Sequence, residues 1–451
     1  MASRHAEGEP SPVAAGAAPA LLLALWLALS VLVLVALALW QGHSYWEYSD
    51  GVYSLSARYV LDGRSLYSDF AAAQPPSLFY VGAGVLAIDD GVTALRVAMA
   101  GCKAVVSLLV LVAVWRLTGR REAALLAALA ALVTPWALRE HAQLLPETLA
   151  APLVMGAALA ASRRTTAVLA GVLGAVAATF KLAFALPALA IVLLGRHARR
   201  GLIGFAGAGA VLAVAFLALF GEGLWTNVIH AQTQAGSASL RYAAGLWAQA
   251  GWNVLALLVL AALAWPERER LREPDLARSL LIAAAGSLLL LATLLKSGSY
   301  LTVMIVVEPP LVCLAACGVV ATFRARPAGA RPSRARLAVV GLASGLALAQ
   351  VVSLLVSPDD PALFTQPLGA SGPRRAFSDA EVDAAARAIA ACPAGSTYAG
   401  PPYLAFVARR DIAGLQPDPF IIRAAPVLGG FRTRADTDPR ICAAPGLPAI
   451  P

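Results

Sequence analysis

Charged residues are scarce in this chain, because Asp, Glu, Lys and Arg make up 14% of its 451 residues and hydrophobic residues 59%. A soluble domain carries about 25% charged residues, so a fold that is surrounded only by water is excluded. The uncharged run from Ala20 to Trp40 would span about 30 Å as a helix, which is the thickness of the hydrocarbon core of a bilayer. This run is longer than the apolar region of a cleaved signal peptide, about 7–15 residues, and so predicts an uncleaved membrane anchor.

Lysine is rarer still, with three lysines against 32 arginines. The net charge of +9 does not indicate nucleic acid as a partner, because the arginines come in short bursts between apolar runs, as topology signals do. The chain also lacks a Walker motif, a GxSxG elbow and a pair of CxxC motifs. Soluble nucleotide chemistry and serine hydrolysis therefore have no support.

Hydropathy predicts an all-α polytopic membrane protein. With the N-terminus in the cytoplasm, 18 arginines fall on the inner side and only a handful in the outer loops. The apolar segment 75–88 is too short for a crossing and is predicted to be an interfacial or re-entrant helix. About eleven transmembrane helices remain, at residues 20–40, 94–116, 122–138, 147–162, 165–180, 182–195, 201–220, 252–265, 279–295, 303–322 and 337–356.

Three parts follow from this map: a cytoplasmic N-terminal tail at 1–19, a transmembrane domain at 20–356 with an outer loop at 41–93, and an extracytoplasmic C-terminal domain at 357–451. The last part is rich in Pro, Arg, Asp and Gly and is predicted to be a small α/β domain with an amphipathic helix at 379–391. On this side Cys392 and Cys442 face an oxidising compartment, which favours a disulfide between them over two free thiols.

Acidic residues stand in two of the predicted outer loops. Asp50 lies about ten residues beyond the first span and is followed by Gly51, which leaves room beside the carboxylate. Such a carboxylate suits general base work or metal binding, or it caps a helix that begins at Val52. Glu140 and Glu147 lie in the second loop, REHAQLLPE, where stabilisation of a helix end is the alternative role.

The lysines mark the outer boundary of the apolar spans. Lys181 and Lys296 both lie there, where a lysine either reaches to the lipid headgroups or binds an anionic group such as a lipid phosphate. Lys103 lies about nine residues inside its span and needs an acidic partner, for which Asp89, Asp90 and Glu308 are the candidates.

A family resemblance emerges from the order of these motifs. Asp50 is followed by G-x-Y, by a short helix that ends in LDGRSLYSDF, and by QPP with an aromatic run. This order resembles the first outer loop of GT-C glycosyltransferases, polytopic enzymes that use polyprenyl-phosphate sugars. The bacterial branch related to protein mannosyltransferases and the lipid A aminoarabinose transferase is most similar. Further similar segments are LPETLA at 145–150, FKLAFALP at 180–187, KSGSYLTVMIVVEPP at 296–310 and the tail from Gly395 to Arg410.

The resemblance implies roles for individual residues. Asp50 would be the catalytic base, with Glu147 or Glu140 as a second acidic residue near the site. Gln74 stands where the family commonly has a basic residue that meets the donor phosphate, which leaves that task to Lys181, Lys296 or Arg139. Two departures from the family pattern count against a divalent metal and leave open that this chain is an inactive member of the family. Ser49 stands in place of an acidic residue, and Thr302-Val303 stands in place of Asn-Tyr.

The resulting prediction is an inverting glycosyltransferase in the bacterial inner membrane. It would move a sugar from a polyprenyl phosphate to an extracytoplasmic glycan, lipid or protein, with no cofactor required by the lipid donor itself. A lipid or solute transporter is one alternative, but its two corresponding halves with broken spans are not visible in the sequence. A non-catalytic membrane scaffold with an outer binding domain is the other, and it predicts that Asp50 is dispensable.

Overall fold

The structure is a computed structural model that describes residues 12–42, 48–140, 142–234, 236–296, 300–323, 333–356, 378–418 and 441–442. Most of the predicted N-terminal tail at 1–19 and much of the C-terminal domain at 357–451 lie outside the described residues. The same holds for four of the arginines assigned to the inner side, Arg4, Arg324, Arg326 and Arg331.

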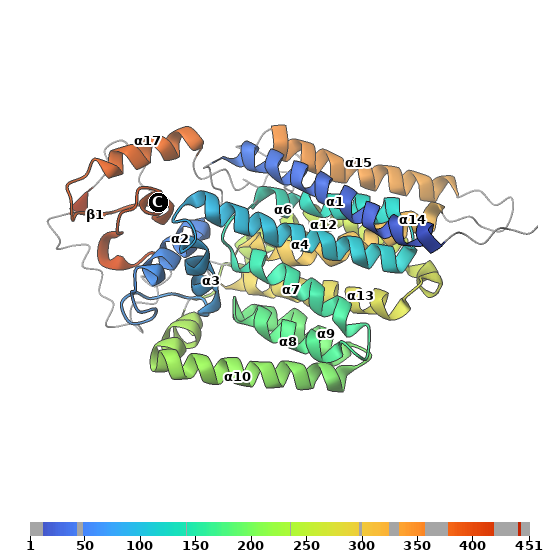
Figure 1. Cartoon of the computed structure of the whole chain (residues 1–451), viewed down its shortest axis with the longest axis horizontal. Helices are drawn as coiled ribbons and strands as arrows, with labels where there is room; N and C mark the ends of the chain where they lie inside the picture. The colour runs from blue at the N-terminus through green and yellow to red at the C-terminus, as the bar shows by residue number, and fades with distance from the viewer. Residues whose placement is uncertain are drawn as a thin grey trace, which may run out of the picture.

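Seven helical segments in the described ranges are long and apolar enough to cross a membrane, and they run roughly parallel in Figure 1. Two of them are completed by short helices at an end: η4 (Leu289–Leu295) continues α13, and η5 (Leu301–Val303) precedes α14. A third, α10, continues through η2 (Trp225–His230) and α11 (Ala231–Thr233). The long helices are α1 (Pro12–Gln41), α4 (Val92–Thr118), α10 (Ala198–Leu224), α12 (Leu240–Ala262), α13 (Pro274–Leu288), α14 (Met304–Phe323) and α15 (Arg334–Val356).

Shorter helices occupy the other predicted spans, and each of the eleven is helical over most of its length. The predicted all-α polytopic architecture is therefore confirmed. The start of α12 differs from the prediction, because Ser239 accepts a hydrogen bond from the Tyr242 N–H and caps the helix well before residue 252. The shorter helices are α5 (Arg121–Leu132), α6 (Pro135–Arg139), α7 (Pro146–Ala161), α8 (Ala167–Ala178), η1 (Leu182–Phe184) and α9 (Ala185–Leu194).

Close backbone contact holds the periphery of the bundle to its centre. The enclosed helix α14 packs against α4, α5, α7, α12 and α13, whereas α10 reaches the bundle mainly through α8 and α9. A Cβ atom on Gly171 would lie 1.9 Å from the carbonyl oxygen of Gly201, and one on Gly204 would lie 2.1 Å from that of Val168. Glycine at these positions lets α8 and α10 touch along their backbones, as small residues do between membrane helices.

The predicted outer loop and the C-terminal segment gather at one end of the bundle, on the left of Figure 1. The loop forms α2 (Tyr48–Leu61) and α3 (Ser77–Leu86), a short helix that packs against α2 and α4. The tail forms α17 (Asp379–Ala390), β1 (Thr397–Tyr398), α18 (Pro402–Val407) and η6 (Ala413–Leu415), and β1 pairs in parallel with β2 (Ile441–Cys442). Cys392 and Cys442 form a disulfide.

The tail is fixed onto α2 by polar contacts. Arg58 donates to the carbonyl oxygen of Phe406 at 2.5 Å and stacks on its ring, with 4.2 Å between the guanidinium carbon and the ring centroid. Arg64 donates to both carboxylate oxygens of Asp411, at 2.8 and 2.9 Å. These bonds join residues more than 300 positions apart, so the loop and the tail form one unit at this end.

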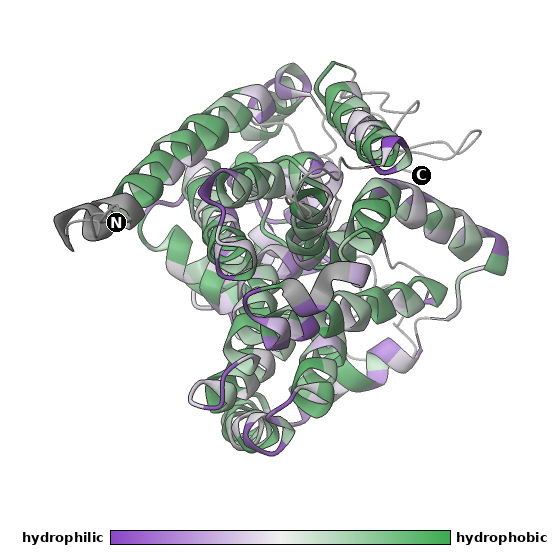
Figure 2. Cartoon of the chain, turned by 90° about the vertical axis from the view of Figure 1, so that its right-hand side faces the viewer, coloured by the Kyte–Doolittle hydropathy of each residue, from purple (hydrophilic) through white to green (hydrophobic). Residues whose placement is uncertain are grey.

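Arginines and carboxylates gather at the opposite end of the bundle. Figure 2 looks onto this end, where hydrophilic residues lie on the turns while the helices behind them are largely hydrophobic. Glu273 pairs with both Arg116 and Arg163, and Asp275 pairs with Arg196 at 2.5 Å. Loops that were all assigned to one side of the membrane are thus together in space.

Replacement of Gly51 tests the contact between α2 and the tail. A Cβ atom there would lie 2.4 Å from the backbone nitrogen of Tyr403, so we expect Gly51→Ala to push α18 away and to destabilise the protein by about 1–3 kcal/mol. The measurements are the thermal midpoint in detergent and the rate of proteolysis of the tail. Gly84→Ala is the matched control. No neighbouring atom lies within 4 Å of the position that the methyl group would take, and alanine in a helix should stabilise the protein slightly relative to glycine. Equal effects of the two variants would refute the contact.

Candidate functional site

The α6–α7 loop, residues 140–145, lies at the same end as α2 and connects the residues singled out above. The helix that leads into the loop, α6, is anchored by Glu308 of α14, which accepts hydrogen bonds from the backbone N–H groups of Trp136 at 3.2 Å and Ala137 at 3.4 Å. Thr134 donates to the same carboxylate at 2.6 Å. A carboxylate at the N-terminus of α6 satisfies N–H groups that have no partner within the helix.

Asp50 anchors the loop itself. Its side chain is 2% exposed; Oδ1 accepts from the Leu144 N–H at 2.7 Å, and Oδ2 pairs with Arg96 at 3.0 Å. Arg96 also donates to the carbonyl oxygen of Ala142 and to the hydroxyl of Tyr403, both at 3.1 Å. One ion pair therefore joins α2, α4, the α6–α7 loop and the tail.

The expected alternative role of Asp50 as a helix N-cap is wrong, because α2 begins at Tyr48 and places Asp50 inside its first turn. Burial raises the pKa of Asp50, while Arg96, the Leu144 N–H and Ser54 stabilise the carboxylate and oppose the rise. A buried carboxylate of raised pKa is a better proton acceptor than an exposed one, provided that a substrate reaches it.

Arg139 and Glu140 lie side by side at the start of the loop. Both are almost fully buried, and their charged groups are 3.3 Å apart. Arg139 donates to the Tyr300 hydroxyl at 3.1 Å and stacks on the rings of Trp136 and Tyr300. Its guanidinium is thus held by protein groups within the wall of the site.

Lys103, whose depth in α4 requires a partner, lies beside the same loop. Its amine donates to the carbonyl oxygen of Ala137 and interacts electrostatically with Glu140 and Glu308. Of the three predicted partners, Glu308 is therefore correct. Asp90 pairs with Arg58 instead.

Glu147 follows the loop in the first turn of α7 and positions a lysine. Lys181 donates to Glu147 Oε1 at 2.7 Å, and its side chain is 24% exposed while that of Glu147 is 1% exposed. Lys296 lies near enough to Lys181 for the two charges to repel each other. Burial, and then Lys181, lower the pKa of Lys296 to about 8, and Asp418 of the tail opposes the shift. The two predicted phosphate-binding lysines are therefore neighbours in space.

An apolar groove with a volume of about 290 Å³ lies next to the segment that carries Lys181. Thr179 and Leu182, which flank Lys181 in sequence, line it together with Phe216, Trp225 and other residues of α8, α10 and η2. Pro75, from the loop between α2 and α3, also lines it. The groove is thus an apolar channel along α10 and η2, and Lys181 adjoins its lining residue Leu182 in sequence.

Gln74 holds the edge of this groove in place. Its side chain donates to the Tyr53 hydroxyl at 3.3 Å, and its carbonyl oxygen accepts from the Tyr67 hydroxyl at 2.6 Å. Asn227 of η2 accepts from the Ala72 N–H at 3.3 Å and so attaches the same loop to this helix. Gln74 therefore engages neighbouring tyrosines, and its role at a donor phosphate stays a prediction.

Chemically, the arrangement combines four buried carboxylates with two partly accessible lysines, and an apolar groove adjoins the segment of Lys181. The prediction missed three groups that hold it together, namely Arg96, Tyr300 and Tyr403. Their partners are distant in sequence, and the available signals were the position of Arg96 near a span boundary and the place of Tyr300 and Tyr403 within two family-like segments. Among the residues that the structure describes, no three His, Cys, Asp or Glu side chains come together as a ligand set for a metal ion.

Comparisons with known proteins identify the fold. No family model and no characterised protein matches the chain in sequence. The solved structures that match in three dimensions include ArnT from Cupriavidus metallidurans bound to undecaprenyl phosphate, with a TM-score of 0.60, and the same protein in the apo state, with 0.58. Each is 17% identical to this chain; the matches cover 90% and 89% of this chain and 88% of ArnT, a lipid A aminoarabinose transferase of the GT-C superfamily. This chain therefore has the polytopic membrane fold of ArnT, in agreement with the fold that the resemblance of its motifs implied.

Proposed function

We propose that this protein is a membrane glycosyltransferase that moves a sugar from a polyprenyl phosphate to an acceptor hydroxyl on the outer face of the membrane. The observation that carries the proposal is the interaction of Lys181 with Lys296, next to a segment that lines an apolar groove, in a fold whose solved example ArnT was obtained bound to undecaprenyl phosphate. The lysines suit the phosphate, and the groove suits the part of the polyprenyl chain next to it. The rest of the chain would extend into the bilayer.

The proposed chemistry is a single displacement. The acceptor oxygen attacks the anomeric carbon, the bond from that carbon to the phosphate oxygen breaks, and the electron pair leaves with the polyprenyl phosphate. Asp50 takes the proton of the acceptor hydroxyl, for which its raised pKa is favourable. Lys181 and Lys296 stabilise the negative charge that develops on the leaving phosphate.

The supporting residues keep this geometry. Glu147 orients Lys181, and the ion pair of Arg139 with Glu140 forms part of the wall next to Tyr300. Asp50 reaches an acceptor only if its contact with Leu144 or Ser54 is exchanged for one with the substrate, since both of its oxygens have protein partners here. Substrate binding between α2 and the α6–α7 loop would make this exchange.

We assign the end that holds the arginine-rich turns to the cytoplasm and the end with α2 and the tail to the outside. The charge asymmetry follows the positive-inside rule, and the disulfide between Cys392 and Cys442 is compatible with an oxidising compartment. The site then faces the side on which polyprenyl-linked sugars meet acceptors of the cell envelope.

Asp50→Asn tests the base. We expect sugar transfer in membranes with a radiolabelled panel of polyprenyl-phosphate sugars to fall by about 10²–10⁴, the usual contribution of a general base. The single variant leaves Arg96 buried without a counter-charge, which costs about 3–5 kcal/mol of stability. The double variant Asp50→Asn/Arg96→Gln removes both charges and separates the two effects.

If Asp50 is the base, the double variant regains thermal stability while transfer stays at least about a hundredfold below wild type. Recovery of transfer together with stability would mean that the ion pair only positions the α6–α7 loop, and the base would then have to be sought elsewhere. Wild-type protein that consumes no donor of the panel would favour the scaffold alternative over a transferase.

The pH dependence of donor use tests Lys296. Because its pKa is lowered to about 8, the amine is charged below this pH and becomes neutral above it. We therefore expect kcat/KM for the donor to be level up to about pH 7 and to fall by as much as about tenfold by pH 9. Lys296→Arg keeps its charge over this range and should give a level profile. A profile that falls identically in both proteins would remove Lys296 from the phosphate site.

A further inference from the structure

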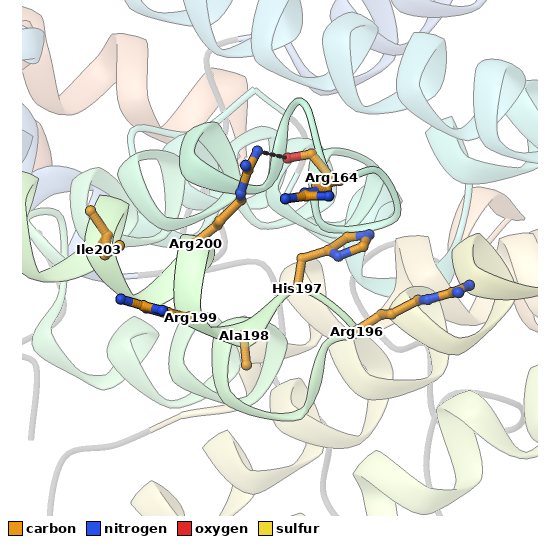
Figure 3. Close-up of a pocket in the computed structure, with 7 residues that line it drawn as sticks. All are labelled: Arg164, Arg196, His197, Ala198, Arg199, Arg200 and Ile203. Carbon is orange, nitrogen blue, oxygen red and sulfur yellow. Dashed lines mark hydrogen bonds between the residues drawn. The ribbon is translucent and has the colours of Figure 1, made fainter.

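A basic cavity lies at the end of the bundle opposite to the candidate site. It has a volume of about 550 Å³ and is situated where the turn after α7 meets the turn that leads into α10. In Figure 3 the side chains of Arg164, Arg200 and His197 lie around the same space, with Arg196 and Arg199 on either side. Four arginines and one histidine thus surround a single cavity.

The positive charge of this cavity is only partly compensated. Arg196 pairs with Asp275, and it is the only one of the four arginines with a carboxylate partner among the described residues. Arg200 donates to the carbonyl oxygen of Arg164 at 3.1 Å, which fixes its direction without neutralising it. Like charges around one concave site attract an anion, and planar guanidinium groups are suited to the oxygens of a phosphate.

The neighbourhood of the cavity favours a lipid as the source of this phosphate. Ile203 lines the cavity and is 59% exposed, and further along α10 the side chains of Val211 and Val214 are 70% and 67% exposed. This face of α10 is apolar and uncovered, as expected of a helix face in contact with lipid. A phosphate in the cavity would therefore have its acyl chains beside α10. Basic pockets between membrane helices are a known setting for anionic lipid headgroups.

We propose that this cavity binds the headgroup phosphate of an anionic phospholipid, with Arg164, Arg199 and Arg200 as its phosphate ligands and α10 as the surface for its acyl chains. The site is separate from the sugar-transfer site and does not depend on the function proposed for it. The ligand is a phosphodiester that is joined to acyl chains and carries a net negative charge.

Lipid binding by the full-length protein in detergent tests the proposal. Native mass spectrometry with phosphatidylglycerol should show one saturable high-affinity site, and phosphatidylcholine, whose headgroup is neutral overall, should not occupy it. Each arginine near the surface of an anionic lipid layer strengthens the binding affinity by about fivefold. We therefore expect Arg164→Gln/Arg199→Gln to weaken binding by about twenty- to thirtyfold.

The matched control is Arg120→Gln/Arg121→Gln, which removes the same charge from the turn between α4 and α5 at the same end of the bundle. This control should bind phosphatidylglycerol within about threefold of wild type. Equal losses in both double variants would show a general charge effect and overturn the proposal. If millimolar inorganic phosphate competes for the site as well as the lipid does, the site binds a soluble anion, and this result would also overturn the proposal.

Discussion

The buried ion pair of Asp50 with Arg96 is the interaction on which the site end of the molecule depends. It bonds to Leu144 and Ala142 on the α6–α7 loop and to Tyr403 of the tail, so one pair fixes three segments against α4. Removing one member of a buried pair is costly, whereas replacing both by apolar groups is often neutral. The main effect of the pair is therefore to specify how these segments are arranged, and its contribution to the net free energy of folding is less clear.

This arrangement couples the two halves of the proposed reaction. The loop held by Asp50 begins with Glu140 beside Arg139 and leads into α7, where Glu147 orients Lys181. A displacement of the loop would thus move the proposed base and the donor phosphate site together. The tail takes part as well, since Asp418 acts on Lys296 and Tyr403 acts on Arg96. An acceptor that contacts the tail would for this reason influence both sides of the reaction.

The long-range hydropathy and charge pattern made the fold predictable, since a membrane helix must satisfy its own backbone and its arginines mark one side. The proximity of Lys181 to Lys296 also followed, because both lie at one boundary. The partners of Asp50 could not be predicted in this way. Arg96 is 46 positions away from it, and Tyr403, which binds Arg96, is 353 positions away and comes close because Gly51 leaves room for α18 against α2. Local propensity likewise predicted an N-cap at Asp50, but the helix extends to Tyr48.

Backbone strain is concentrated where these distant segments meet. Among the described residues, four other than glycine have positive φ angles, and they lie in the α2–α3 loop (Tyr67), the α6–α7 loop (Ala142) and the tail (Arg409 and Leu415). Such conformations persist only where the surroundings impose them. Arg96 holds the carbonyl oxygen of Ala142, and Gln74 and Phe70 hold Tyr67 through their carbonyl oxygens. Within the described residues, this strain is confined to the end with the carboxylates and lysines. This distribution is expected of a site whose geometry overrides the conformational preference of its backbone.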